Sequence, residues 1–400
     1  MLCALYHERR GDHGTETTGI HKVFFSTEVS LLQVDEYHVT LSGEGDVSWS
    51  YEPHVDGWRA DFCPMEKIST PITIVIPVHN SEKTLEAVLK SLSSELLGGD
   101  ELIVVDDRSV DRSREIASLF EAEIIPSSGN PGAAGARNTG ALAAAGEWVL
   151  FVDSDAVAPP GWRKKLQQRI DQEPSAVQAT YSSLAAGKNP ATFYKNFYYF
   201  YTFTRRIKSD YITGCGTFFF AVAKSIFLEL KGFDDRIPGA TVEDADFAAR
   251  LVGSGGNILM APDIEVFHLR EYTFSELMGY EWKMMKSKVL YILRRSRDHA
   301  APSVSMATPV EMLPVLSGSV SVWLIPVGLI AFAAGSLWGM WLAAAGFLIL
   351  AVGHAGFWLA SVRKAGLIGF IASLMTLPDL MLILPAALSG VMKHLTGRKY

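Results

Sequence analysis

Two pairs of aspartates in this 400-residue chain have the spacing of a ligand site. Asp106 and Asp107 follow one run of apolar residues, and Asp153 and Asp155 follow another. Alternate residues of an extended segment point to the same side, so Asp153 and Asp155 can contact one cation. Carboxylate oxygens suit Mg²⁺ or Mn²⁺ bound to a diphosphate. Aspartate also favours the turns after strands for purely structural reasons, but two such pairs favour a metal and diphosphate site.

Apolar segments predict the elements that position these aspartates. Short runs at 72–76, 102–105, 124–125 and 148–152 are typical of buried parallel strands. Between them, apolar residues recur at helical spacing from Leu85 to Leu96, and Asp111 can cap a second helix. This alternation predicts an α/β fold with a doubly wound, mostly parallel sheet. Ligands bind beyond the carboxyl ends of such strands, which is where both aspartate pairs lie.

Six motifs occur in the order found in family 2 glycosyltransferases. They are 71–80 (PITIVIPVHN), 104–111 (VVDDRSVD), 135–140 (GARNTG), 151–155 (FVDSD), 232–235 (GFDD) and 243–250 (EDADFAAR). Over roughly residues 71–270 the chain therefore resembles this family. The resemblance implies a GT-A fold, which is a Rossmann-like domain with a mostly parallel sheet. It also implies a UDP- or GDP-sugar donor, a Mg²⁺ or Mn²⁺ cofactor and an inverting reaction.

The resemblance further implies roles for single residues. Pro77, Asn80 and Glu82 would border the nucleoside pocket, and Asp106 or Asp107 would accept hydrogen bonds from the base or ribose. Asp153 and Asp155 match the metal-binding motif, and Asp244, next to Glu243, matches the catalytic base. The Gln-x-x-Arg-Trp motif of processive synthases is absent from the sequence, which argues against polymer synthesis with translocation.

The chemistry of inversion explains why such residues are needed. A base must face the acceptor hydroxyl, and positive charge must stabilise the departing diphosphate. We expect Asp244 to remove the proton and a metal held by Asp153 and Asp155 to neutralise the leaving group. The structural alternative for Glu243 and Asp244 is a helix cap and acidic first turn, stabilised by the helix dipole. One residue can serve both purposes.

Arg137 and His268 are candidates that each have a structural alternative. Arg137 lies in a stretch rich in Gly and Ala that lacks the Gly-Lys-Ser/Thr of a phosphate-binding loop. These small residues favour close packing of a helix on the sheet, although Arg137 can still reach the diphosphate. His268 follows a predicted strand and is either a third metal ligand or a structural histidine. Eight aromatic residues between positions 193 and 203 predict core packing or an acceptor groove beside a membrane.

The C-terminal quarter is nearly free of charge. Residues 312–362 contain no Asp, Glu, Lys or Arg, and 365–392 contain only Asp379. Apolar segments at 312–335, 338–362 and 367–392 are long enough to span a bilayer, which predicts a transmembrane region with two to three helical segments over 312–392.

The basic residues around these segments predict their orientation. Arg294, Arg295 and Arg297 precede the first segment, and Arg363 and Lys364 follow the second, so a hairpin with both ends in the cytoplasm is predicted. We expect a third crossing. The alternative is a re-entrant or interfacial segment, because a crossing would put the basic C-terminus outside.

Residues 276–300 are predicted to form an amphipathic interfacial helix. Met278, Trp282 and Met285 recur at helical spacing and are interleaved with lysines and arginines. Such a helix can lie at the membrane surface with its cations on anionic headgroups. The alternative is packing against the catalytic domain.

Composition limits the remaining possibilities. The net charge is −7, but residues 276–400 carry eleven Lys and Arg against five Asp and Glu. The acidic remainder argues against nucleic-acid binding. Three scattered cysteines are too few for a disulfide framework or a zinc site. Residues 1–69 show patchy alternation of apolar and polar residues and no signal peptide. We expect a small β-rich appendage, a partly ordered arm, or a natural start of translation at Met65.

Together these patterns predict a glycosyltransferase domain at 70–275 that is anchored to a membrane. Its acceptor is expected to be a lipid or lipid-linked molecule at the cytoplasmic face. One alternative is a soluble or protein acceptor. Another is a catalytically silent sugar-nucleotide-binding subunit of a glycan export complex.

Overall fold

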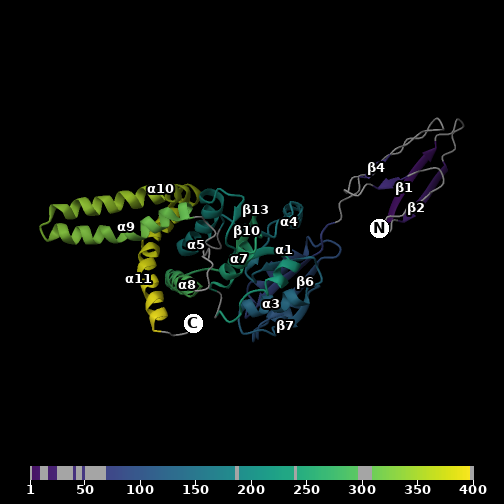
Figure 1. Cartoon of the computed structure of the whole chain (residues 1–400), viewed down its shortest axis with the longest axis horizontal. Helices are drawn as coiled ribbons and strands as arrows, with labels where there is room; N and C mark the ends of the chain where they lie inside the picture. Colours follow the sequence, from purple (N-terminus) through teal and green to yellow (C-terminus); the bar gives the residue numbers. More distant parts are fainter. Residues whose placement is uncertain are drawn as a thin grey trace. The chain divides into compact units, whose positions relative to one another are not determined.

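The computed structural model describes residues 2–9, 17–24, 39–41, 47–49, 69–184, 189–237, 241–295 and 309–396 (Figure 1). The chain divides into two compact units, Met1–Ile68 and Ser69–Tyr400. In the first unit, β1 (Leu2–Arg9) pairs with β2 (Thr17–Phe24) and β3 (Val39–Leu41) with β4 (Val47–Trp49), each pair antiparallel. The expected start at Met65 and the side chain of Arg297 lie outside the described residues.

A nine-stranded sheet forms the centre of the second unit. Its strands are β5 (Ile72–Val78), β6 (Glu101–Asp106), β7 (Glu123–Pro126), β8 (Trp148–Val152), β9 (Ala156–Val157), β10 (Ala176–Tyr181), β11 (Tyr211–Ile212), β12 (Phe219–Ala223) and β13 (Ile258–His268). The order is β11-β13-β10-β12-β8-β5-β6-β7, and β9 pairs with β13. All four strands predicted from the sequence are present and parallel to one another.

The other half of the sheet mixes strand directions. β12 runs antiparallel to both neighbours, β8 and β10, and β13 runs parallel to β10. Six strands therefore share one direction and end at one edge, which confirms the α/β fold with a mostly parallel sheet. The carboxyl edge carries the ends of β5, β6, β8, β10 and β13, so it gathers residues from positions 78 to 268.

Helices cover this sheet. They are α1 (Leu85–Ser93), α2 (Ser113–Ala117), α3 (Ala133–Ala143), α4 (Trp162–Ile170), α5 (Pro190–Tyr201) with a π-helical turn at Thr202–Arg206, α6 (Lys224–Glu229) and α7 (Glu243–Gly253). The small residues of α3 allow close packing, because a Cβ at Gly140 would stand 2.3 Å from Cγ1 of Val75 on β5. Asp111 accepts hydrogen bonds from the backbone and hydroxyl of Ser113 at the start of α2.

Four long helices follow: α8 (Phe274–Arg295), α9 (Pro309–Ala333), α10 (Leu337–Leu374) and α11 (Thr376–Leu395). The first two apolar segments predicted from the sequence fall on α9 and α10, which pack along each other. The segment expected at 367–392 is not one helix. Ala365 and Gly366 break α10 with non-helical backbone angles, residues 367–374 continue it, and α11 begins after Met375.

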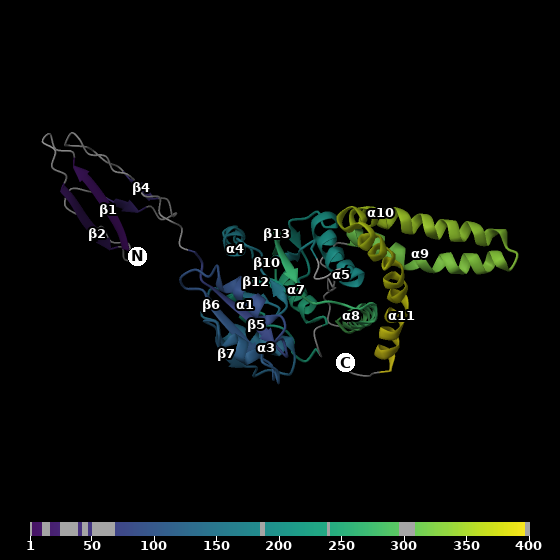
Figure 2. The same ribbon diagram turned by 180° about the vertical axis from the view of Figure 1, so that it is seen from behind.

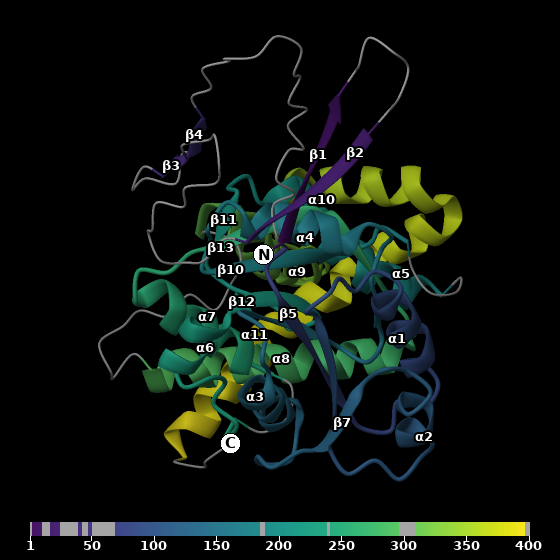
Figure 3. The same ribbon diagram turned by 90° about the vertical axis from the view of Figure 1, so that its right-hand side faces the viewer.

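The α9–α10 hairpin runs in one direction, and α8 and α11 run across it. Figures 1 and 2 show α9 and α10 lengthwise, α11 crossing their direction, and α8 almost end-on. Figure 3, turned by 90°, shows α8 and α11 from the side. The hairpin exposes large apolar side chains along its length, including Phe347 and Leu348 at 62 and 63%. Two apolar stretches, Met312–Ala333 and Leu337–Leu395, are long and apolar enough to cross a membrane.

Candidate active site

The predicted site residues meet at the carboxyl edge of the sheet. Pro77 lies near the end of β5, and Asn80 and Glu82 follow that strand. Asp106 ends β6, Asp153 and Asp155 follow β8, and His268 ends β13. The β9–β13 pairing places His268 opposite Ala156, directly after Asp155. Sheet topology thus gathers residues that are far apart in the sequence.

Asn80 and Glu82 join the loops after β5 and β6. The Asn80 side-chain oxygen accepts a 2.9 Å hydrogen bond from the Val110 amide, and Glu82 accepts one of 3.3 Å from the Arg112 amide. Asn80 has a φ of 51°, a left-handed conformation that asparagine tolerates better than most residues. The two residues therefore connect the loops beside which a nucleoside is expected to bind. Their direct contact with a nucleoside stays a prediction.

Asp106 and Asp107 both have protein partners. Asp106 is buried, accepts from the Ser109 amide at 3.1 Å and pairs with Arg114 at 2.5 Å. Burial opposes its ionisation, but the bonds from Ser109 and Arg114 outweigh this effect and lower the pKa of Asp106. Asp107 accepts a 2.7 Å bond from the Gly132 amide. The predicted bonds to a base or ribose would have to use the remaining acceptor sites of these carboxylates.

Arg137 links the two acidic motifs. It is 3% exposed on α3, and its Nη2 donates to Asp153 Oδ1 at 2.7 Å while its Nη1 lies 3.5 Å from Glu243 Oε1. Burial disfavours its charge, but Asp153 and Glu243 more than compensate and raise the pKa of Arg137. A permanent cation therefore lies between the predicted metal motif and the predicted base, where a diphosphate was expected.

Asp155, His268 and Asn196 form a chain of contacts. His268 Nε2 lies 3.4 Å from Asp155 Oδ2, and His268 Nδ1 lies 3.2 Å from the Asn196 side-chain oxygen. The ring is therefore held with Nδ1 toward Asn196 and Nε2 toward the carboxylate. Burial opposes ionisation of Asp155, but His268 and Arg270 hold its pKa below the ordinary value.

These contacts fit a divalent metal without completing its site. His268 Nε2 and the Asp155 carboxylate face each other, and imidazole nitrogen and carboxylate oxygen are both possible ligands of a divalent metal. Within the described ranges, no group of three or more His, Cys, Asp or Glu side chains is arranged as a ready metal site. Asp155 and His268 therefore fit part of a ligand set. That Asp153, whose Oδ1 pairs with Arg137, joins them on one metal stays a prediction.

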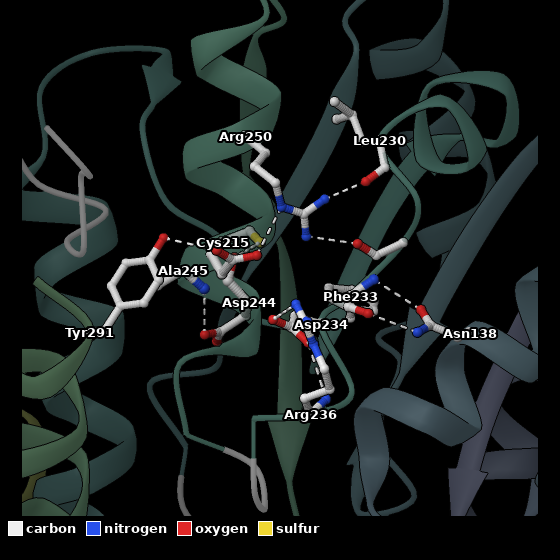
Figure 4. Close-up of polar contacts among 12 residues, drawn as sticks. Asn138, Cys215, Leu230, Phe233, Asp234, Arg236, Asp244, Ala245, Arg250 and Tyr291 are labelled. Atoms are coloured by element: carbon white, nitrogen blue, oxygen red, sulfur yellow. Dashed lines mark hydrogen bonds and ion pairs between the residues drawn. The ribbon is translucent and has the colours of Figure 1, made fainter. Parts of the chain in front are cut away.

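Glu243 and Asp244 lie in the first turn of α7, and neither is its N-cap, which is Val242. Glu243 is buried and accepts a 2.7 Å bond from the Thr241 amide. Asp244 accepts from the Ala245 amide at 2.7 Å, and its own carbonyl accepts from the Cys215 thiol (Figure 4). Burial, assisted by the charge of Glu243, raises the pKa of Asp244 to about 7. Such a carboxylate is suited to act as a base at neutral pH.

The structure also reveals supporting residues to which the sequence analysis assigned no role. Asn138 of α3 bonds both the amide and the carbonyl of Phe233, which fixes the loop before α7. Arg250 pairs with Asp246 at 2.8 Å and donates to the Leu230 and Gly232 carbonyls, and Tyr291 of α8 donates to Asp246 at 3.1 Å (Figure 4). Asn138, Asp246 and Arg250 stand inside recognised motifs, but nothing in the sequence points to Tyr291.

Comparison with known proteins agrees with this architecture. Residues 73–230 match the family described as Glycosyl transferase family 2. An uncharacterized glycosyltransferase of Haemophilus influenzae is 35% identical over 105 residues, which cover 26% of this chain and 36% of that protein. The pre-mycofactocin glycosyltransferase of Mycobacterium tuberculosis is 27% identical over 205 residues, covering 49% and 42%. The matches thus span less than half the length of these relatives.

A solved structure extends the likeness beyond the matched segment. The mannosyltransferase PcManGT from Pyrobaculum calidifontis, determined with GDP-Man and Mn²⁺, aligns with 83% of this chain and 89% of its own. The TM-score is 0.50 and the sequence identity is 18%, so this likeness concerns the fold. The chain therefore carries a family 2 glycosyltransferase domain of the GT-A fold, followed by long apolar helices.

Proposed function

We propose that this protein transfers a sugar, with inversion, from a UDP- or GDP-sugar to a lipid or lipid-linked acceptor at the cytoplasmic face of a membrane. The observation that carries the proposal is the convergence of Asp153, Arg137, Glu243 and Asp244 at the carboxyl edge of a GT-A sheet. A buried cation for the diphosphate and a half-buried carboxylate with a pKa near 7 then lie at the same edge of the sheet. The family and the GT-A fold support the same assignment.

Asp244 is the proposed base. In its ionised form it accepts the proton of the acceptor hydroxyl while the oxygen attacks the anomeric carbon and the bond to the diphosphate breaks. The Ala245 amide of α7 holds the Asp244 carboxylate in place. Arg137 stabilises negative charge on the leaving diphosphate from the side of Asp153.

Asp153, Asp155 and His268 would hold Mg²⁺ or Mn²⁺, and such a metal, when bound, supplies further positive charge to the diphosphate. Asn196 holds the His268 ring so that Nε2 faces Asp155. Pro77, Asn80 and Glu82, with Asp106 and Asp107, would border the nucleoside.

A membrane acceptor is supported by the helices that follow the domain. The aromatic rings of α5 surround Phe357 of α10, with centroid distances of 5.9 Å to Tyr194, 5.7 Å to Tyr198 and 5.5 Å to Tyr201. The part of the chain from β5 to β13, here called the catalytic unit, therefore packs directly on the base of the apolar hairpin. If the hairpin crosses a bilayer, an acceptor at the lipid surface lies close to the site. A soluble or protein acceptor remains the competing proposal.

Turnover by an Asp244→Asn variant tests the assignment. Purified protein is incubated with UDP- and GDP-sugars, Mn²⁺ and a membrane lipid extract, and product is followed by mass spectrometry. We expect wild-type turnover and a loss of about 10²-fold or more in the variant, with donor affinity nearly unchanged. Asp263→Asn, a partly exposed acid paired with Arg169, is the control. Donor binding without turnover in the wild type would favour the silent binding subunit.

A further inference from the structure

Helix α11 exposes an apolar face along its second half. Leu384, Leu388, Met392 and Leu395 recur at helical spacing and are 38, 65, 61 and 72% exposed. We call these four residues the α11 stripe. Isolated exposed leucines are common, but a continuous row over three turns of a helix indicates a surface that is covered in use.

The opposite face of α11 lies against α8. At Gly390 an added Cβ would stand 3.0 Å from the Lys286 carbonyl oxygen and 3.1 Å from Val289 Cβ. Helix α8 in turn contacts α7 of the catalytic unit through Tyr291 and Asp246. The α11 stripe therefore points away from the catalytic unit.

The first half of the same face packs on the hairpin. Leu377 and Met381 precede the α11 stripe on the same side of the helix, and both contact a cluster formed by Val315, Val322 and Leu350 with Leu380. The face that is exposed at Leu388 is thus the continuation of the face that touches α9 and α10. It is turned toward the side from which the hairpin projects.

Helix α11 begins at the base of the hairpin. Trp358 Nε1 on α10 donates to Thr376 Oγ1 at 3.2 Å. The stretch of α10 from Leu337 to Trp358 is about 33 Å long at ~1.5 Å per residue, close to the ~30 Å of a bilayer's hydrocarbon core. Asp379, the only charged residue in 365–392, accepts a 2.6 Å hydrogen bond from Tyr194 of the catalytic unit. Its carboxylate is therefore held beside the catalytic unit.

We propose that α11 lies flat on the leaflet next to the catalytic unit, with the α11 stripe inserted among the lipids. Its direction across the hairpin gives this orientation once the hairpin crosses the bilayer (Figure 3). Leucine and methionine enter the boundary between headgroups and acyl chains, and the nearby Lys393, with Arg398 and Lys399 in the sequence, suits anionic headgroups. The chain then crosses the membrane twice, and its C-terminus stays on the catalytic side. The inference rests on the proposed membrane hairpin.

Depth-dependent quenching tests this arrangement in the full-length protein. Cys3 and Cys63 are replaced by serine, Cys215 being buried, and single cysteines carry a bimane fluorophore. The protein is placed in vesicles of phosphatidylcholine and phosphatidylglycerol with lipids brominated either near the headgroup or near the chain end. Leu388→Cys and Met392→Cys report on the α11 stripe, and Phe347→Cys on the middle of the hairpin. Leu119→Cys, 78% exposed on the catalytic unit, is the control.

We expect the shallow bromolipid to quench positions 388 and 392 more than the deep one, the deep bromolipid to quench position 347 more, and neither to quench position 119. Deep quenching at 388 and 392 would mean that α11 crosses the membrane and would overturn the proposal. Absence of quenching there, with 347 quenched, would mean that water or a protein covers the stripe and would also overturn it. Absence of quenching at 347 would instead refute the hairpin itself.

Discussion

At the scale of single residues, the ionisation of Asp244 controls the proposed reaction. Burial and the Glu243 carboxylate both disfavour its charge and raise the pKa of Asp244 to about 7. Only the ionised form can accept the acceptor's proton. Turnover is therefore expected to rise about tenfold per pH unit below 7 and to level off above it. Measuring kcat between pH 5.5 and 8.5 checks this, and a flat profile across pH 7 would argue against Asp244 as the base.

Two neighbours of Asp244 are expected to shift this profile in opposite directions. The charge of Glu243 raises the pKa of Asp244, and the charge of Lys288 on α8 lowers it. Glu243→Gln should move the midpoint of the kcat profile to lower pH, and Lys288→Met should move it to higher pH. Shifts of the same sign in both variants would show that the profile reports another group.

Donor affinity is expected to depend on the metal motif. Asp153→Asn and Asp155→Asn each remove an anionic oxygen from the proposed ligand set, so they should weaken binding of UDP or GDP in the presence of Mn²⁺. Calorimetric titration with and without Mn²⁺ isolates this effect, and Asp263→Asn again serves as the control. Equal affinities in the wild type and both variants would remove the metal site from the mechanism.

The sequence identified the acidic residues of the site more readily than their partners. Asp153, Asp155, Glu243 and Asp244 belong to motifs whose spacing can be read directly. The contact of Arg137 with both Asp153 and Glu243 depends on where α3 and α7 meet, 106 positions apart in the chain. Short-range patterns do not contain that information.

At the scale of elements, the strands and the hairpin helices could be predicted, but the end of the chain could not. Mainly apolar runs define β5, β6 and β8, because a strand buried on both faces has few polar positions. The segment 367–392 is uniformly apolar as well, so its division into the end of α10 and a separate α11 left little trace in composition. Gly366 marks the break, since its φ of 55° suits glycine.

The contact between α8 and α11 is expected to be sensitive to volume at Gly390. Gly390→Leu would force the helices apart and should destabilise the fold by about 1–3 kcal/mol. Gly279→Leu makes the same change at a position of α8 where nothing lies within 4 Å of a Cβ, and it should be neutral or stabilising. Thermal unfolding in detergent compares the two. Equal Tm values would mean that α8 and α11 are not tightly packed.

At the scale of the whole molecule, polar contacts join the catalytic unit to α8 and α11, and the apolar contacts of Phe357 join it to the hairpin. Lys195 of α5 pairs with Glu281 of α8 at 2.6 Å and lies 4.1 Å from the centre of the Tyr280 ring. Tyr194 reaches Asp379 of α11. Buried pairs of this kind are costly to break singly, so they fix one relative position of the elements. If the hairpin crosses a bilayer, that position sets how far the proposed active site lies from the lipid surface.

Phe357 is expected to be the main apolar contact in this junction. Phe357→Ala leaves a cavity among the rings of α5. For a buried phenylalanine, such a change lowers the free energy of unfolding by about 3–5 kcal/mol. The catalytic unit should then loosen from the hairpin, so that transfer to a membrane-bound acceptor falls while nucleotide affinity stays unchanged. Spin labels on the two parts should show a broader distance distribution in the variant. Phe347→Ala, on the same helix but 62% exposed, is the matched control and should change neither quantity. If Phe357→Ala behaves like this control, the aromatic cluster does not position the catalytic unit on the hairpin.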